Sequence, residues 1–141
     1  MKKLKFAIKI NAPKEKVWEA LWSEPSYKQW TAVFSQGSYA VSDWKEGSRI
    51  KFLNATGDGM YSVIEKKLIN KQMTFKHLGE IINGKEKESE WAGALESYLL
   101  TEKEDGTELT AEMDTNEEYQ SYFEGIFPKA LEKIKHLSEK L

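Results

Sequence analysis

Cysteine is absent from this sequence of 141 residues, and histidine occurs only twice. The lack of cysteine excludes disulfides, thiol redox chemistry and a cysteine nucleophile. Two histidines far apart leave mainly carboxylates as metal ligands, and the acidic residues are mixed with lysines, as on a solvated surface. We therefore expect neither a metal site nor a cofactor.

Long apolar runs and an excess of one charge are also missing. No run approaches the roughly 18 apolar residues of a membrane span. Lys9 interrupts the N-terminal apolar run too early for the hydrophobic region of a signal peptide. The formal net charge of −2 gives no reason to expect nucleic acid or an anionic membrane as a partner. We expect one cytoplasmic domain over residues 1–141, without membrane insertion.

Common sequence motifs of enzymes are lacking too. The chain contains no GxSxG turn for a serine nucleophile, and neither GxGxxG nor GxxxxGK for phosphates. The GDG at 57–59 is typical of a hairpin turn. The chain contains the residue types of a Ser–His–Asp site, so such a site is not excluded, but no motif indicates where it would lie.

The N-terminal residues predict a strand followed by two short helices. Residues 3–10 alternate apolar residues with lysines, which is typical of a strand with one solvated face. Pro13 suits the first position of a helix that ends at residues 23–25. Residues 26–34 then predict a second short helix that ends near Trp30.

The middle of the chain predicts strands. Short β-branched or aromatic runs are separated by turn signals at 38–42, 48–55, 60–69 and 72–79. In the third run the apolar residues do not keep to one face. Residues 82–91 are strongly charged and predict a flexible solvated loop, and residues 94–114 predict a hairpin. Strands joined by tight turns form an antiparallel sheet, here of six to seven strands.

The C-terminal residues predict a long amphipathic helix, capped by Asn116, that covers the curved sheet. This helix contains two helix-breaking residues: an interior proline costs about 3 kcal/mol and a glycine about 1 kcal/mol. We expect Gly125 and Pro128 to bend the helix so that both halves follow the sheet. The alternative is a break, with Pro128 opening a new helix. The fold class is α+β in either case.

Several of these segments resemble a known family. The segment INAPKEKVWEALW resembles the first strand and helix of the START-like (Bet v 1-like, SRPBCC) superfamily. Trp30, EDGTELT and FPKALEKIKHLSEKL resemble its AHSA1-like branch, named after the activator of Hsp90 ATPase, and FKHLGEI resembles bacterial members. The resemblance implies the helix-grip fold, with a cavity between the C-terminal helix and the sheet. Its members include carriers, cyclases and co-chaperone domains.

Aromatic residues make up 12% of the chain, and such rings fill a core or line a cavity.

His77 shares a strand face with Met73 and Phe75, so it would point inward with them. There it could form a hydrogen bond with a ligand or act as a general base, with Glu65 or Glu80 as its partner. The alternative is a histidine satisfied by the backbone. His136 falls on the solvated face of the last helix. The predicted ligand-binding residues are Trp30, Phe34, Phe52, Asn54, Phe75, His77, Tyr98, Phe123 and Phe127.

Three functions compete on this sequence. The aromatic excess and the shortage of catalytic groups favour binding of a small hydrophobic or amphipathic molecule in the cavity. A cyclase or dehydratase that uses His77 is the enzyme alternative. The family resemblance also implies a chaperone-partner domain, although the chain resembles a single such domain and lacks the second module of the eukaryotic co-chaperone.

Overall fold

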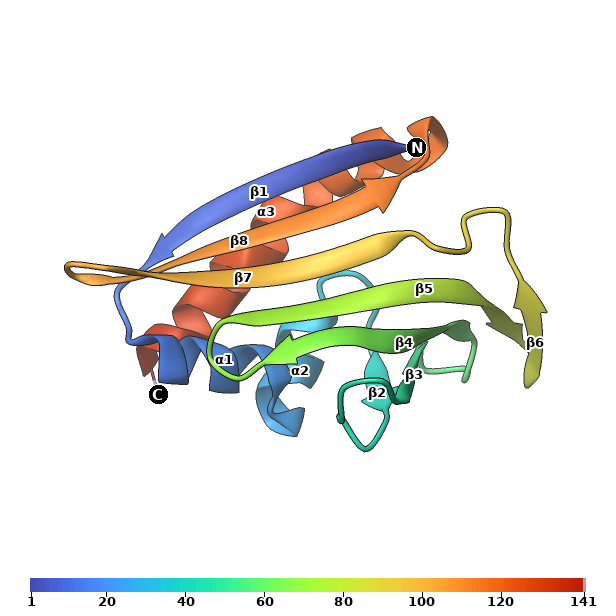
Figure 1. The fold of residues 1–141 in the computed structure, drawn as a ribbon, viewed down its shortest axis with the longest axis horizontal. Helices are drawn as coiled ribbons and strands as arrows, with labels where there is room; N and C mark the ends of the chain where they lie inside the picture. The colour runs from blue at the N-terminus through green and yellow to red at the C-terminus, as the bar shows by residue number, and fades with distance from the viewer. Residues whose placement is uncertain (141) are drawn as a thin grey trace.

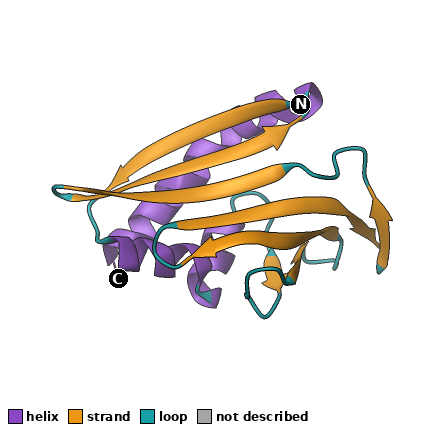
Figure 2. Cartoon of the chain, viewed as in Figure 1, coloured by secondary structure: helices purple, strands orange, loops and turns teal. Residues whose placement is uncertain are grey.

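The computed structural model describes residues 1–140, which form an antiparallel sheet with three helices on one face (Figures 1 and 2). The first and last strands of the chain are neighbours in the sheet, and the strand order is β1-β8-β7-β5-β4-β3-β2, with β6 paired to β5. The elements are β1 (Lys2–Ile10), α1 (Lys14–Trp22), α2 (Glu24–Thr31), β2 (Tyr39–Val41), β3 (Arg49–Leu53), β4 (Gly59–Leu68), β5 (Gln72–Ile82), β6 (Lys85–Glu88), β7 (Leu95–Lys103), β8 (Gly106–Thr115) and α3 (Glu117–Lys140). This is the helix-grip α+β fold that the sequence predicts.

Two predicted boundaries were wrong. Residues 82–91 are not simply a loop, because β5 continues to Ile82 and Lys85–Glu88 pairs back onto it as β6. The sheet therefore has eight strands and not six or seven. Asn83 and Gly84 both take positive φ angles and make the tight turn that this hairpin requires. The start of the second helix was also predicted too late. Helix α2 begins at Glu24, and Pro25 lies in its first turn, where the missing N–H of proline costs nothing.

Strand β4 explains why its faces look mixed in the sequence. Its pairing with β5 shifts register twice, between Tyr61 and Ser62 and between Ile64 and Lys66. Each shift changes which side chains point to a given face of the sheet. Glu65 is the extra residue of β4 at the second shift and is exposed, whereas Ile64 just before it is buried.

Helix α3 runs unbroken through Pro128, so the proline does not open a new helix. The helix begins after Asn116, whose side-chain oxygen accepts a hydrogen bond from the Tyr119 N–H at 3.3 Å, as expected for a cap. The bend at Gly125–Pro128 stays a prediction. None of the helices in the described part of the chain is long and apolar enough to span a membrane.

The two halves of α3 are buried differently. In the C-terminal half, Ala130, Leu131 and Ile134 are almost fully buried in the core that α1 shares with the sheet. In the N-terminal half, the rings of Tyr119 and Tyr122 are about half exposed, at 49% and 48%. The helix therefore packs tightly at one end and leaves space beneath the other.

Candidate functional site

A cavity of about 750 Å³ lies between the sheet, α2 and the N-terminal half of α3. Strands β3, β4, β5 and β7 supply one wall, and α2 with the loop that follows it supplies the opposite wall. Exposed side chains at the rim, among them Ile82, Tyr119 and Tyr122, mark the end that meets solvent.

All nine predicted ligand-binding residues lie on the wall of this cavity. Their burial varies with depth: Phe75, Tyr98 and Phe127 are each 1% exposed, whereas Phe34 and Phe123 are only partly buried. The nine are Trp30, Phe34, Phe52, Asn54, Phe75, His77, Tyr98, Phe123 and Phe127. The structure brings them together from five elements, α2, β3, β5, β7 and α3, and from the loops that follow α2 and β3.

The inner end of the cavity is a cluster of aromatic rings around Trp22. Its ring meets those of Tyr98 and Phe75 edge to face, with centroids 5.2 and 5.4 Å apart. Trp30 and Tyr27 pack on the same ring at 6.4 and 6.5 Å. Trp30 is held in place because its indole N–H donates to the Leu21 carbonyl at 3.0 Å. The Trp22 Nε1 atom is buried and has no hydrogen-bond partner among the described residues.

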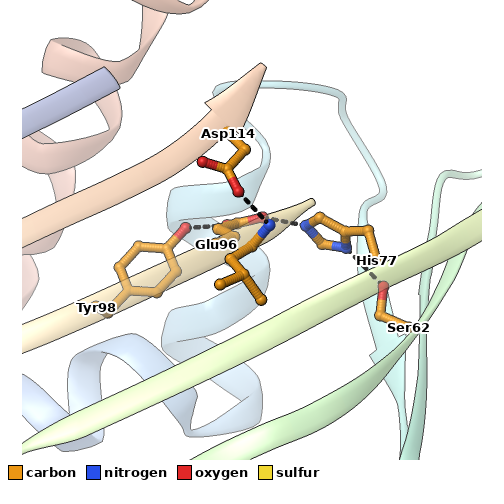
Figure 3. A network of polar contacts seen from close by, with 6 residues as sticks. Ser62, His77, Glu96, Tyr98 and Asp114 are labelled. Atoms are coloured by element: carbon orange, nitrogen blue, oxygen red, sulfur yellow. Dashed lines mark hydrogen bonds and ion pairs between the residues drawn. The ribbon is translucent and has the colours of Figure 1, made fainter. Parts of the chain in front are cut away.

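A chain of polar side chains crosses this apolar wall (Figure 3). His77 lies 2.9 Å through Nε2 from Glu96 Oε1 and 2.6 Å through Nδ1 from the Ser62 hydroxyl. The Tyr98 hydroxyl donates a short hydrogen bond to the other carboxylate oxygen of Glu96. Three strands therefore hold the chain: β4 supplies Ser62, β5 supplies His77, and β7 supplies Glu96 and Tyr98.

Glu96 carries the negative charge of this chain of contacts. Its side chain is 21% exposed, and burial alone would raise the pKa of its carboxyl. Hydrogen bonds from His77 and Tyr98, together with the charge of the His77 ring, outweigh that effect and lower the Glu96 pKa. Burial raises the pKa of Tyr98 and of Tyr27, and the nearby Glu96 charge raises both further. Both phenols therefore stay protonated beside an ionised carboxylate.

The predicted partner of His77 was wrong, because neither Glu65 nor Glu80 bonds it. Glu65 is exposed at a register shift of β4, and Glu80 is exposed at the rim of the cavity. The partner is Glu96, which lies diagonally across from His77 on β7. Nor is the histidine satisfied by a backbone carbonyl, since both ring nitrogens contact side chains.

Ser62 does not act as a nucleophile towards the contents of the cavity. Its side chain is fully buried, and it is not part of the wall. Its position opposite His77 in the β4–β5 pair lets its hydroxyl orient the ring. With both ring nitrogens engaged, His77 has no unused nitrogen for a substrate, and the group available from the cavity is the Glu96 carboxylate.

Asn54 lies on the cavity wall and also forms hydrogen bonds with nearby backbone groups. Its side-chain oxygen accepts hydrogen bonds from the N–H groups of Thr56 and Asp58 at 2.9 and 3.2 Å. These contacts close the turn between β3 and β4. His136 is exposed on α3, as its place in the helix predicts.

Sequence analysis missed Glu96, Trp22 and Tyr27. A signal for Glu96 is present, because it precedes Tyr98 by two residues and strand alternation puts both on one face. Tyr27 precedes Trp30 by three residues, the spacing of one helix face. No comparable signal distinguishes Trp22, which flanks the apolar stripe of α1, and only packing shows that it is central.

Comparison with known proteins gives a family match. A family model described as Activator of Hsp90 ATPase homolog 1-like protein matches residues 11–139. No curated protein matches the sequence.

The fold recurs in solved structures. The Aha1 dimer from Colwellia psychrerythraea is 22% identical, with a TM-score of 0.77 over 99% of this chain and 97% of that chain. A protein from Cytophaga hutchinsonii is 26% identical, with a TM-score of 0.74 over 99% and 95%. DynU16, from the dynemicin biosynthetic locus, is 14% identical, with a TM-score of 0.73 over 95% of this chain and 46% of that chain. These likenesses establish a shared fold.

Proposed function

This chain belongs to the family of Activator of Hsp90 ATPase homolog 1-like proteins, and from that premise we propose that it binds a small hydrophobic or amphipathic molecule between α3 and the sheet. The observation that carries this proposal is the cavity itself. Its volume of about 750 Å³ falls within the roughly 300–1,000 Å³ of small-molecule sites. An aromatic wall with a few polar groups suits a ligand that has an apolar body and a polar end.

The proposal is tested by filling the cavity from within. Ala94 is 5% exposed on the wall, so Ala94→Phe places a ring in the space that a ligand would occupy. Ligands that raise the melting temperature of the wild type, found in a thermal-shift screen of lipids and aromatic compounds, should lose that effect. A ligand present at a hundred times its Kd stabilises a protein by about 2.7 kcal/mol, which such a screen detects.

Ala92→Phe is the matched control, because Ala92 is exposed two residues away. It should leave ligand-induced stabilisation unchanged. Equal stabilisation of the Ala94→Phe protein, or failure of every ligand class to stabilise the wild type, would count against binding in this cavity.

Catalysis is the second candidate, favoured by the buried contact between His77 and Glu96. In this arrangement His77 orients and polarises the carboxylate, and Glu96 is the base that faces the cavity. A cyclase or dehydratase that uses His77 itself as the base would first have to break that 2.9 Å contact. Binding alone requires no such step, which is why we rank it first.

The family description and the name of the Colwellia relative also suggest a chaperone partner. Recovery of an Hsp90-type chaperone on the immobilised protein would place this third function ahead of the other two. A chaperone that binds the Ala94→Phe variant equally well would show that this interaction does not use the cavity.

A further inference from the structure

The charged residues on the cavity wall are all acidic. Among the residues that the structure describes, the wall includes Asp58, Glu80, Glu96 and Asp114 but no lysine or arginine. Composition does not explain this bias, because the chain has 21 lysines and arginines against 23 acidic residues. The basic residues are therefore kept away from the cavity.

Only one of the four carboxylates lies deep in the cavity without a lysine, an arginine or a backbone N–H beside it. Asp114 accepts a hydrogen bond from the Leu95 N–H at 3.0 Å and pairs with Lys3 at 3.4 Å. Asp58 accepts from the Asn83 N–H at 3.0 Å, and Glu80 is exposed to solvent at the rim. That leaves Glu96 as the carboxylate that a buried ligand would meet.

The cavity wall is net negative whichever protonation state His77 takes, because it carries four carboxylates against one histidine. A neutral His77 ring with its hydrogen on Nε2 donates to Glu96 and accepts from the Ser62 hydroxyl through Nδ1, whereas a protonated ring donates to both, so the two observed contacts are satisfied in either state. Ser62 has no other side-chain hydrogen-bond partner among the described residues. The Tyr98 hydroxyl is the second donor to the Glu96 carboxylate.

Aromatic rings pack around Tyr98, the residue that bonds the Glu96 carboxylate. Tyr98 bonds Glu96 directly, and its ring is 5.2 Å from that of Trp22 and 6.0 Å from that of Trp30. Ring faces attract cations, and the attraction grows when the cation is desolvated. A carboxylate next to several such rings is the chemistry that recognises an organic ammonium group.

We infer that the molecule bound in the cavity carries a cationic or strongly hydrogen-bond-donating group that contacts Glu96, with its apolar body among the rings. This inference rests on the proposed binding function and assigns its ligand class. An anionic amphiphile such as a fatty acid would instead bring a further negative charge into a desolvated site whose described wall offers it no lysine or arginine. Such like-charge contacts are strongly unfavourable.

Three probes of one shape separate these possibilities: 2-(1-naphthyl)ethylamine, 2-(1-naphthyl)ethanol and 1-naphthylacetate. Each has the same bicyclic ring with a cationic, neutral or anionic end, and binding is followed by quenching of Trp22 and Trp30 fluorescence and by calorimetry. We expect the amine to bind about 10-fold more tightly than the alcohol, as a charge-assisted hydrogen bond and ring contact predict. The carboxylate should bind most weakly.

Replacing the deep carboxylate tests its assignment. Glu96→Gln keeps the shape and much of the hydrogen-bonding capacity but removes the charge, so the advantage of the amine over the alcohol should fall by about 10-fold. Binding of the alcohol should change little. Glu65→Gln makes the same charge change at an exposed position outside the cavity and should keep the preference.

The outcomes distinguish a failure of the proposed binding function from a failure of the inferred ligand class. If none of the probes binds the wild type, the proposed binding function fails. If they bind but the carboxylate matches or exceeds the amine, the cation inference is overturned and ligand binding stands. An amine preference that survives in Glu96→Gln overturns the role of Glu96. The wild-type order of the three probes is informative even if this variant does not fold.

Discussion

At the scale of single residues, Glu96 decides the character of the site. A partly buried carboxylate in an aromatic wall is costly unless it is hydrogen-bonded, and His77 and Tyr98 supply those bonds from two neighbouring strands. Ser62 in turn orients His77, so each group depends on the next. Removal of one member leaves the others without partners, which costs more than a single hydrogen bond contributes.

The lowered pKa of Glu96 makes part of the folding free energy depend on pH. A carboxyl whose pKa is lower in the folded than in the unfolded chain stabilises the fold above its ordinary value of 4.5, and this contribution is lost as pH falls through the folded value. We therefore expect Glu96→Gln to reduce the free energy of unfolding by roughly 1–3 kcal/mol at pH 7. The difference from wild type should shrink below pH 4.5.

Urea denaturation at several pH values measures this difference. His77, Tyr98 and Tyr27 surround Glu96 and are present in both proteins. The difference in unfolding free energy between the two proteins therefore reports the Glu96 charge together with its interactions with these three groups. Glu65→Gln, at an exposed site, should show a small effect without this pH dependence. A Glu96→Gln deficit that is equally large at pH 3 and pH 7 would contradict the role assigned to the charge.

At the scale of the elements, α3 carries two residues that weaken a helix, and they differ in what they contact. Pro128 is exposed and lies within an unbroken helix. A Cβ at Gly125 would meet no atom within 4 Å, so packing does not require glycine there. The glycine therefore costs helix stability without a packing reason.

Gly125→Ala should accordingly stabilise the protein by about 0.5–1 kcal/mol, because alanine loses less conformational entropy in a helix. Thermal or urea unfolding measures the change. Gly59→Ala is the contrasting variant, since a Cβ there would lie 1.8 Å from the Phe52 carbonyl oxygen and must displace the β3–β4 pair. If Gly125→Ala lowered the free energy of unfolding and Gly59→Ala left it unchanged, the roles assigned to these two glycines would be contradicted.

At the scale of the whole molecule, the cavity divides the fold into a tightly packed end and an open end. The C-terminal half of α3 covers buried residues of β1 and α1, and Phe127 stacks on Phe6 with centroids 5.2 Å apart. The N-terminal half spans the mouth of the cavity. Backbone hydrogen bonds over a cavity open more readily than those over a core.

Hydrogen exchange should reveal this division. Amides of residues 118–124 should exchange faster than those of 130–137, although both belong to one helix. A bound ligand should slow the first group much more than the second, because it fills the space beneath the first group only. Uniform exchange along α3, with or without ligand, would contradict the division.

The sequence by itself determined the order of the elements apart from β6, the antiparallel sheet and which aromatic residues face inward. These follow from local rules, namely strand alternation in β5 and β7 and the apolar stripe of α3, so Phe75, Tyr98 and Phe127 could be placed without a structure. The same rules could have placed Glu96 beside Tyr98. The family resemblance then implied where the cavity would lie.

Only the tertiary structure decided which polar groups meet. The contact between His77 and Glu96 depends on β5 pairing with β7. The contact between His77 and Ser62 depends on a register shift between β4 and β5, where Leu78 is the extra residue, and local periodicity does not reveal it. The exclusion of lysine and arginine from the cavity is likewise a property of side chains gathered from distant segments. Pairing across strands is set by global packing, and for this reason the chemistry of the site could not be derived from any single stretch of the chain.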